Sequence, residues 1–382
     1  MDTYQIIPKE YEVLGELPDP FIFDNGKIIE SKSEWQLRRK EIYKTAVEMQ
    51  YGTIPPKPEF LEFEPLRDTY YDYCPYLVKT GTRENPLTFT MMLIRPLGEG
   101  PFPVVVDGDL CFKYPYDKEF ISQFVNNGIA LALFNRTDFA PDRKASGRNG
   151  QLYNAYPEYT FGALGAWAWG YSRCVDVLEQ LKFIDKDCIA FTGHSRGGKA
   201  AMLAGVLDER AAIVNPNNSG AGSCGCYRVH MLADRTDGKE ERNETLKDLS
   251  GNISFWMGPE ILKYAECEQN LPFDEHFLKA LVAPRVLLMT EADDDIWANP
   301  IGNFQTSLAA KEVYRFLDAE DNIFLHFRKG IHFHALDDLK TLIAVIKHTK
   351  SGEALPDGFG RVPISDIKPI YSWKCPEKKE GE

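Results

Sequence analysis

The sequence has no block of basic residues and no long hydrophobic run. Its 382 residues carry 44 basic and 57 acidic side chains, which gives a net charge of −13 at pH 7. Because nucleic acids and anionic membranes attract positive charge, neither is expected as a partner. No apolar stretch approaches the roughly 18 residues that a membrane-spanning helix needs. With 43% hydrophobic and 26% charged residues, the composition is that of a folded globular protein.

The N-terminus and the cysteines carry no targeting or redox signal. Met1-Asp2-Thr3-Tyr4-Gln5 has neither the basic nor the apolar region of a secretion signal. We therefore expect a cytoplasmic protein, although a leader removed from the sequence would change that expectation. Of eight cysteines only Cys224 and Cys226 lie close together, and their two-residue step is too short for a CxxC redox or zinc motif. Reduced, mostly buried thiols are expected.

The first hundred residues predict a helix and two antiparallel strands. Ser31-Lys32-Ser33-Glu34 offers a capping box, and apolar residues then recur at helical spacing, which predicts a helix over residues 31–52. Two later runs, 70–79 and 88–94, are rich in β-branched and aromatic residues that alternate with polar ones. Such alternation favours strands that are buried on one face.

From residue 102 the apolar runs become continuous, as parallel strands buried on both faces require. Predicted strands at 103–106, 129–134, 188–192, 211–215, 285–290 and 323–327 alternate with predicted helices at 116–126, 165–181, 196–207, 303–317 and 335–348. This alternation predicts an α/β fold with a doubly wound, mostly parallel sheet flanked by helices. Ligands are expected beyond the carboxyl ends of the strands.

The chain is expected to form a single domain over residues 1–374. Within it we interpret residues 1–60 as a helical decoration on the main body. The polar, glycine-containing segment 217–283 interrupts the alternation, and we interpret it as an insertion that lines the substrate cleft. The charged residues 375–382 are expected to form a frayed tail.

The pattern Gly193-His194-Ser195-Arg196-Gly197 lies between strand 188–192 and helix 196–207. A strand, a sharp turn and a helix around G-x-S-x-G form the nucleophile elbow of the α/β-hydrolase fold. Small residues two positions on either side of Ser195 leave room for so tight a turn. We therefore predict Ser195 as a nucleophile; the alternative is a glycine-rich turn in which Ser195 only caps the helix.

A serine nucleophile needs a histidine base that an acid orients. In this fold the acid and then the histidine follow on loops after later strands. His332 and His334 both lie after strand 323–327, and the sequence order alone leaves both open. In the loop after strand 285–290, Asp295 is the first choice for the acid and Asp294 the second.

Arg196 follows the nucleophile directly. The fold places its backbone N–H where it can donate to the oxyanion that forms on the attacked carbonyl. Its guanidinium offers a second, charge-assisted donor or a grip on a carboxylate. A structural ion pair is the alternative role for this side chain.

Further motifs extend the elbow pattern. They are Gly193, Ser195, Arg196, Gly198 and Lys199 at the elbow, Trp167-Ala168-Trp169-Gly170, Asn218-Ser219-Gly220, Leu271-Pro272-Phe273-Asp274-Glu275-His276, Ala283-Pro284-Arg285, Asp295-Ile296-Trp297-Ala298-Asn299-Pro300, and Gly330-Ile331-His332 with Asp338-Leu339. On these motifs the chain resembles the glucuronoyl esterases, a family of carbohydrate esterases, and their bacterial acetyl xylan esterase-like relatives. The family pattern of Gly-x-His followed six positions later by Asp favours His332 over His334.

The resemblance implies roles for several side chains. It implies attack by Ser195, base catalysis by His332 and support of the oxyanion by Arg196. It also implies that Lys199 contacts sugar hydroxyls and that Trp297 forms one wall of the sugar site, although a packing role for the tryptophan is the alternative.

One position departs from the family. Many glucuronoyl esterases take their acid from a Glu just before the Ser-Gly at a strand end, where this sequence has Asn218, which cannot ionise. The resemblance then implies that the acid comes from the loop 293–295, as in other members.

These predictions combine into a serine carbohydrate esterase that acts through an acyl-enzyme. The substrate is expected to be an ester of a sugar or uronic acid, either a glucuronoyl ester or an acetylated xylo-oligosaccharide. A general carboxylesterase, a peptidase of the same fold and a non-catalytic sugar-binding hydrolase fold are the alternatives. No cofactor is expected, and no metal site, because His332-Phe333-His334 lacks a matched carboxylate set. The sequence does not indicate an oligomeric state.

Overall fold

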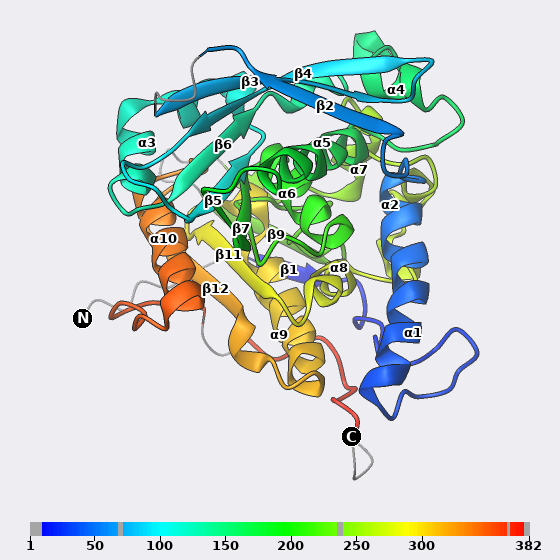
Figure 1. Cartoon of the computed structure of the whole chain (residues 1–382). Coiled ribbons are helices and arrows are strands. Elements are labelled where there is room, and N and C mark those ends of the chain that lie inside the picture. Colours follow the sequence, from blue (N-terminus) through cyan, green and yellow to red (C-terminus); the bar gives the residue numbers. More distant parts are fainter. Residues whose placement is uncertain (1–9, 68–71, 235–239, 365–366, 378–382) are drawn as a thin grey trace.

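The computed structural model describes residues 10–67, 72–234, 240–364 and 367–377 (Figure 1). Its helices are α1 Lys32–Ile42, α2 Met49–Tyr51, α3 Lys118–Val125, α4 Gln151–Ala155, α5 Ala163–Leu178, α6 Arg196–Leu207, α7 Leu246–Ser250, α8 Glu275–Val282, α9 Pro300–Phe316 and α10 Leu336–Ser351. Its strands are β1 Glu10–Val13, β2 Phe60–Pro65, β3 Tyr73–Gly81, β4 Pro86–Ile94, β5 Phe102–Asp107, β6 Ala130–Phe134, β7 Ile184–His194, β8 Ile213–Asn217, β9 Val229–Asp234, β10 Glu240–Arg242, β11 Val286–Ala292 and β12 Ile323–Arg328.

In the described part of the chain, nine strands form the main sheet in the order β12-β11-β8-β7-β5-β6-β4-β3-β2. The six strands from β12 to β6 pair in parallel, and β4, β3 and β2 extend the sheet with antiparallel pairs. Strands β6 and β8 are buried along their whole length, because helices cover both faces of this region. The predicted mostly parallel sheet flanked by helices is confirmed.

The helices divide between the two faces of the sheet (Figure 1). Residues of α5, α6, α8 and α9 share one large apolar core, and residues of α3 and α10 share a second core on the other face. Helix α6 begins at the carboxyl end of β7, in the middle of the sheet. The ends of β7, β8, β11 and β12 therefore meet at one edge, where the predicted site residues lie.

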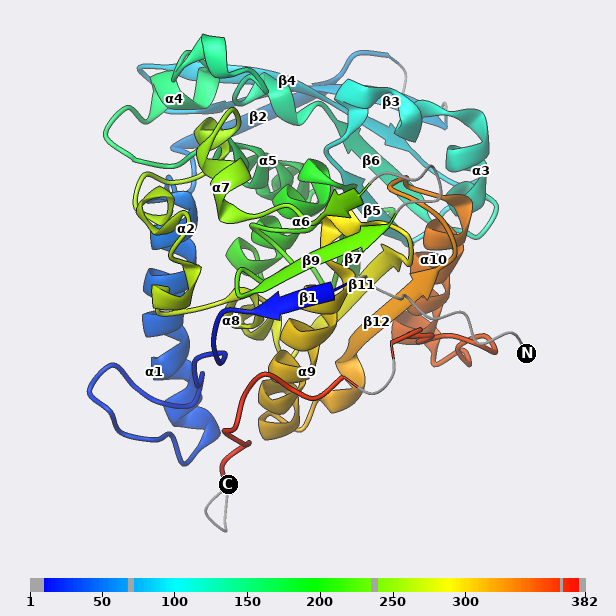
Figure 2. The same cartoon turned by 180° about the vertical axis from the view of Figure 1, so that it is seen from behind.

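A small second sheet joins the N-terminal segment to the insertion. Strand β1 pairs antiparallel with β9 (Figure 2), and β9 also pairs antiparallel with β10. The sheet packs on the start of α9 through apolar contacts that include Val229, Met231 and Ile301. The N-terminal decoration is therefore not only helical, and the insertion contains strands.

The predicted helix 31–52 is interrupted rather than continuous. A π-helical segment, Tyr43–Glu48, separates α1 from α2, and Gly52 follows α2 with a backbone φ of 83°. The capping residue Ser31 accepts a hydrogen bond from Glu34 N, as its position predicts. The start of the predicted strand 70–79 and most of the predicted tail 375–382 lie outside the described residues. None of the helices in the described segments has the length and apolarity that a membrane span requires.

Candidate active site

Ser195 stands at the turn from β7 into α6. Its backbone has φ 58° and ψ −121°, a strained conformation for a residue with a side chain. A Cβ at Gly193 would lie 2.5 Å from Gly197 O, and a Cβ at Gly197 would collide with the carboxylate of Asp109. Glycine is therefore required on both sides of the turn. Ser195 is half-buried, and its Oγ has no hydrogen-bond partner among the described residues.

The predicted histidine and the predicted acid come together. His332 lies on the loop after β12, and its Nδ1 is 2.6 Å from Asp295 Oδ2. The Asp295 side chain is 1% exposed, while that of His332 is 36% exposed. A buried carboxylate that accepts from Nδ1 fixes the tautomer in which Nε2 is free to take a proton.

Three donors hold the Asp295 carboxylate. Besides His332, Asn218 Nδ2 donates to the same oxygen at 2.8 Å, and Ala298 N donates to Oδ1 at 3.3 Å. The acid therefore has a fixed orientation. The amide of Asn218 is one of the groups that orient it.

The other candidates for acid and base occupy different positions. Asp294 is exposed, and Asp293 accepts a hydrogen bond from Gly330 N at 3.0 Å. His334 is buried, its Nδ1 lies 3.3 Å from the Tyr114 hydroxyl, and burial lowers its pKa well below the usual value. Of these residues, only Asp295 and His332 form a pair.

His194 links the elbow to the histidine loop. Its ring centroid is 4.5 Å from that of His332, and its Nδ1 lies 2.6 Å from Asn217 Oδ1. Burial, and then the neighbouring His332, lower the pKa of His194 to about 4, so it is neutral at pH 7. This contact sets the His332 imidazole beside the residue that precedes Ser195.

Arg196 is anchored above the elbow. Its Nη1 donates to Asp142 Oδ2 at 3.0 Å, and its guanidinium lies over the ring of Trp256 at 4.9 Å from the centroid. Trp256 Nε1 in turn donates to Asp142 Oδ1 at 2.8 Å. The side chain of Arg196 is 38% exposed, so the ion pair fixes it while one side stays open to a ligand.

Lys199 lies in the first turns of α6 and is buried. Its Nζ donates to Ser219 O, to Ala221 O and, at 2.6 Å, to Glu244 Oε2. Because all three ammonium protons have protein acceptors, a direct contact between Lys199 and a sugar hydroxyl would require one of these bonds to be exchanged. Glu244 comes from the insertion, and sequence reasoning did not identify it.

Trp297 presents an exposed ring next to this pair. Its side chain is 37% exposed, and its carbonyl accepts a hydrogen bond from Glu244 N at 3.0 Å. The guanidinium of Arg242 lies 5.8 Å from the ring centroid. An exposed aromatic face beside polar side chains has the character of a sugar-binding wall.

A groove of about 1100 Å³ adjoins the histidine loop. Its walls include Phe112, Tyr114, Phe120, Phe333 and His334. It offers space for part of a ligand beside the loop that carries His332. Within the described residues, no three side chains of His, Cys, Asp or Glu are grouped as metal ligands.

Comparisons with known proteins agree with this geometry. A sequence model of the family described as "Glucuronyl esterase, fungi" matches residues 78–318. The chain is 33% identical over 317 residues to the 4-O-methyl-glucuronoyl methylesterase of Podospora anserina, in an alignment that covers 81% of this chain and 62% of that protein. The chain thus spans less than two thirds of the length of that relative.

Two solved structures are similar over nearly the whole chain. A carbohydrate esterase family 15 glucuronoyl esterase from Caldicellulosiruptor kristjansonii has a TM-score of 0.82 and 28% identity, covering 95% of this chain and 98% of that one. A mutant glucuronoyl esterase from Sporotrichum thermophile, in complex with methyl 4-O-methyl-β-D-glucopyranuronate, has a TM-score of 0.74 and 25% identity, covering 94% of each chain.

The family model covers well over half of the chain, and the predicted resemblance and the predicted α/β-hydrolase fold are confirmed. The chain belongs to the glucuronoyl esterase family of carbohydrate esterases.

Proposed function

We propose that this chain is a serine esterase that hydrolyses an ester of a uronic acid through an acyl-enzyme. The observation that carries the proposal is the buried Asp295 carboxylate, 2.6 Å from His332 Nδ1, beside an elbow that carries Ser195. The name of the Podospora relative and the methyl glucuronate ester bound to the Sporotrichum enzyme support a uronic acid ester as the substrate.

The proposed reaction has two steps. Ser195 Oγ attacks the carbonyl carbon of the ester, and its proton passes to His332 Nε2, while Asp295 stabilises the imidazolium that forms. The serine hydroxyl and the imidazole close their hydrogen bond when substrate binds, as catalytic contacts often do. His332 then donates the proton to the departing alcohol. In the second step it activates a water molecule that releases the acid from Ser195.

The oxyanion lies at the start of α6. The first N–H groups of a helix have no partner within the helix, and they carry the positive end of its dipole. Arg196 N belongs to this set, and the guanidinium of Arg196, held by Asp142, adds a positive charge close by. We propose that both groups stabilise the negative oxygen.

The sugar is proposed to bind between Trp297 and the pair Lys199–Glu244. The ring of Trp297 stacks on the sugar, and the buried pair presents a carboxylate edge to its hydroxyls. Lys199 then acts on the substrate indirectly, because its Nζ lies 2.6 Å from Glu244 Oε2 and holds that carboxylate in position. Burial raises the pKa of Glu244, and the ammonium of Lys199 opposes that shift.

Finer parts of the sequence hypothesis remain proposals. They are a single domain over 1–374 with a decoration at 1–60, an insertion at 217–283 and a tail at 375–382, and the cytoplasmic location. A substrate panel would separate hydrolysis of uronate esters from the alternatives. These are hydrolysis of acetylated xylo-oligosaccharides, a general carboxylesterase activity and a peptidase activity. Labelling by a fluorophosphonate probe separates all of these enzymes from a non-catalytic sugar-binding protein.

The proposal is tested by Ser195→Ala. We expect this variant to lose turnover of both 4-nitrophenyl acetate and a benzyl glucuronate ester, while its circular dichroism spectrum is unchanged. Ser351→Ala, at an exposed helix end, is the matched control. Undiminished turnover of both substrates by Ser195→Ala would eliminate Ser195 as the nucleophile.

A further inference from the structure

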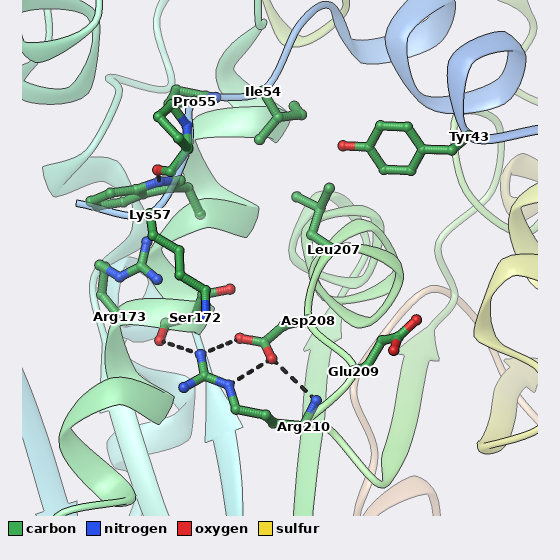
Figure 3. A pocket seen from close by; sticks show the side chains of 12 residues that line it. Tyr43, Ile54, Pro55, Lys57, Ser172, Arg173, Leu207, Asp208, Glu209 and Arg210 are labelled. Atoms are coloured by element: carbon green, nitrogen blue, oxygen red, sulfur yellow. Dashed lines mark hydrogen bonds and ion pairs between the residues drawn. The ribbon is translucent and has the colours of Figure 1, made fainter. Parts of the chain in front are cut away.

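A second cavity lies at the far end of α6 from Ser195. This distal pocket, lined by residues that include Tyr43, Pro55, Lys57, Trp169, Arg173 and Leu207, has a volume of about 710 Å³ (Figure 3). Helix α6 has twelve residues, and at 1.5 Å per residue it separates the pocket from the nucleophile by about 18 Å. A ligand in this pocket therefore does not touch the reacting atoms.

Arg173 brings free donors to the wall of the distal pocket. Its side chain is 2% exposed, its Nε donates to Asp176 Oδ2 at 2.6 Å, and its guanidinium lies 4.2 Å from the ring centroid of Trp169. Neither terminal nitrogen has a hydrogen-bond acceptor among the described residues. A guanidinium that is fixed by Asp176, lines a cavity and keeps two unbonded terminal nitrogens favours a ligand with acceptor oxygens.

Lys57 adds a positive charge to the distal pocket. Lys57 is exposed, lines the same pocket, and forms no ion pair within the described segments. The other charged side chains of the lining are compensated, since Arg210 pairs with Asp208 at 2.6 Å and Glu209 pairs with Arg39. In Figure 3, dashed lines tie Arg210 to Asp208 and Ser172, and Arg173 and Lys57 lie together at one side of the pocket. The unpaired ammonium of Lys57, beside the terminal nitrogens that Arg173 does not use in its ion pair with Asp176, favours an anionic ligand.

The rest of the lining suits the ring of a small organic molecule. Tyr43, Pro55 and Leu207 provide apolar walls, and Trp169 Nε1 donates to Pro56 O at 2.9 Å, which fixes one side of the pocket. Tyr43 lies across the pocket from Arg173 (Figure 3). The volume is within the range of ordinary ligand sites.

We propose that the distal pocket is a second binding site, for a sugar carboxylate whose acid group pairs with the fork of Arg173 and with Lys57. A planar carboxylate matches the two terminal nitrogens of a guanidinium, and the apolar walls take the sugar ring. The choice of a uronate rests on the proposed function, which releases one. The anion site itself rests on Arg173 and Lys57 alone.

The test is binding of sodium glucuronate, measured by calorimetry and by soaking crystals of the whole enzyme. We expect a carboxylate within hydrogen-bond distance of Arg173 in the soaked crystal. Lys57→Glu and Arg173→Lys are each expected to weaken binding at this pocket roughly tenfold, whereas Lys182→Glu, at an exposed lysine elsewhere, is expected to bind as the wild type does. Arg173→Lys keeps the positive charge and removes only the two-pronged guanidinium. If Arg173→Lys fails to fold, Lys57→Glu still tests the site, because Lys57 is exposed and its substitution does not disturb the core.

Three results would overturn this proposal: an empty distal pocket in the soaked crystal, wild-type affinity in Lys57→Glu, or equal binding of glucose, which has the ring without the charge. If inorganic phosphate competes with bound glucuronate as effectively as added glucuronate does, the pocket recognises only the negative charge, and recognition of the sugar is refuted. Because turnover by Ser195 is measured separately, a failure of the proposed esterase function is distinguishable from a failure here.

Discussion

Asp295→Asn removes one charge from the centre of the site at almost constant volume. An asparagine at 295 has a single acceptor oxygen. If that oxygen takes the place of Oδ2, it still accepts from His332 and Asn218, but it has no charge with which to stabilise an imidazolium, and its amide group faces Ala298 N. If the amide is reversed, its NH₂ meets the NH₂ of Asn218 and forces His332 Nδ1 to accept, which puts the proton on the wrong ring nitrogen.

The size of the effect follows from the 2.6 Å separation. With an effective dielectric constant of about 20, unit charges at that distance interact by about 6 kcal/mol, which is an upper bound on the lost stabilisation of the imidazolium. At 1.36 kcal/mol for each tenfold change in rate, a loss of about 4–5.5 kcal/mol lowers kcat by roughly 10³ to 10⁴. KM is expected to change little, because Asp295 is buried behind His332.

The assay is steady-state hydrolysis of a benzyl glucuronate ester, with thermal unfolding as a check on the fold. Asp294→Asn is the matched control, since Asp294 is adjacent in sequence but exposed, and we expect it to stay within about threefold of the wild type. The reasoning is refuted if Asp295→Asn keeps more than a tenth of the wild-type kcat, or if Asp294→Asn loses as much activity.

Three further changes test other parts of the structure. Gly197→Ala should drive a Cβ into the carboxylate of Asp109 and lower the free energy of unfolding by about 1–3 kcal/mol, whereas Gly15→Ala, whose new Cβ would have its nearest neighbour at 3.9 Å, should be neutral in denaturant titrations. Burial lowers the pKa of His276 from 6.5 to about 4, so its contribution to the free energy of unfolding is complete above pH 6.5 and is lost as the pH falls towards 4. Between pH 6.5 and pH 4, the free energy of unfolding should therefore fall by about 3 kcal/mol more in the wild type than in His276→Gln. Trp297→Ala should raise KM for the glucuronate ester roughly fivefold to tenfold with a smaller change in kcat, and an unaltered KM would argue against a sugar-binding wall.

The strands and helices of the central sheet were predictable because each carries a strong local signal. Continuous apolar runs such as 129–134 occur only where both faces are covered, and helix 196–207 has the bounds that the sequence predicts. Strands β1, β9 and β10 were not predicted, because they are three to six residues long and β9 pairs with β1, which is distant in the sequence. The π-helical interruption of the N-terminal helix likewise has no signature in an apolar pattern of period 3.6.

The site was predictable where chain order constrains it. The fold requires an acid and then a histidine after successive strands, and that order alone pointed to Asp295, Asp294, His332 and His334. The choice between the two aspartates was not predictable from spacing, since Asp294 and Asp295 differ only in which way the loop turns after β11. Trp256 and Glu244 were not identified, because they come from an irregular segment and reach Arg196 and Lys199 only through the folded chain.

The position of the acid follows from two loops that leave adjacent strands of the sheet. Asn218 follows β8 and Asp295 follows β11, and these strands are adjacent and parallel in the sheet. Their loops therefore leave the same edge side by side, and Asn218 Nδ2 lies 2.8 Å from the carboxylate oxygen that contacts His332. A carboxylate on either loop can reach the same imidazole nitrogen. Two carboxylates at such a short distance would repel each other unless one of them were protonated. An amide at 218 avoids that repulsion and donates to Asp295, so Asn218 helps to hold the acid in place.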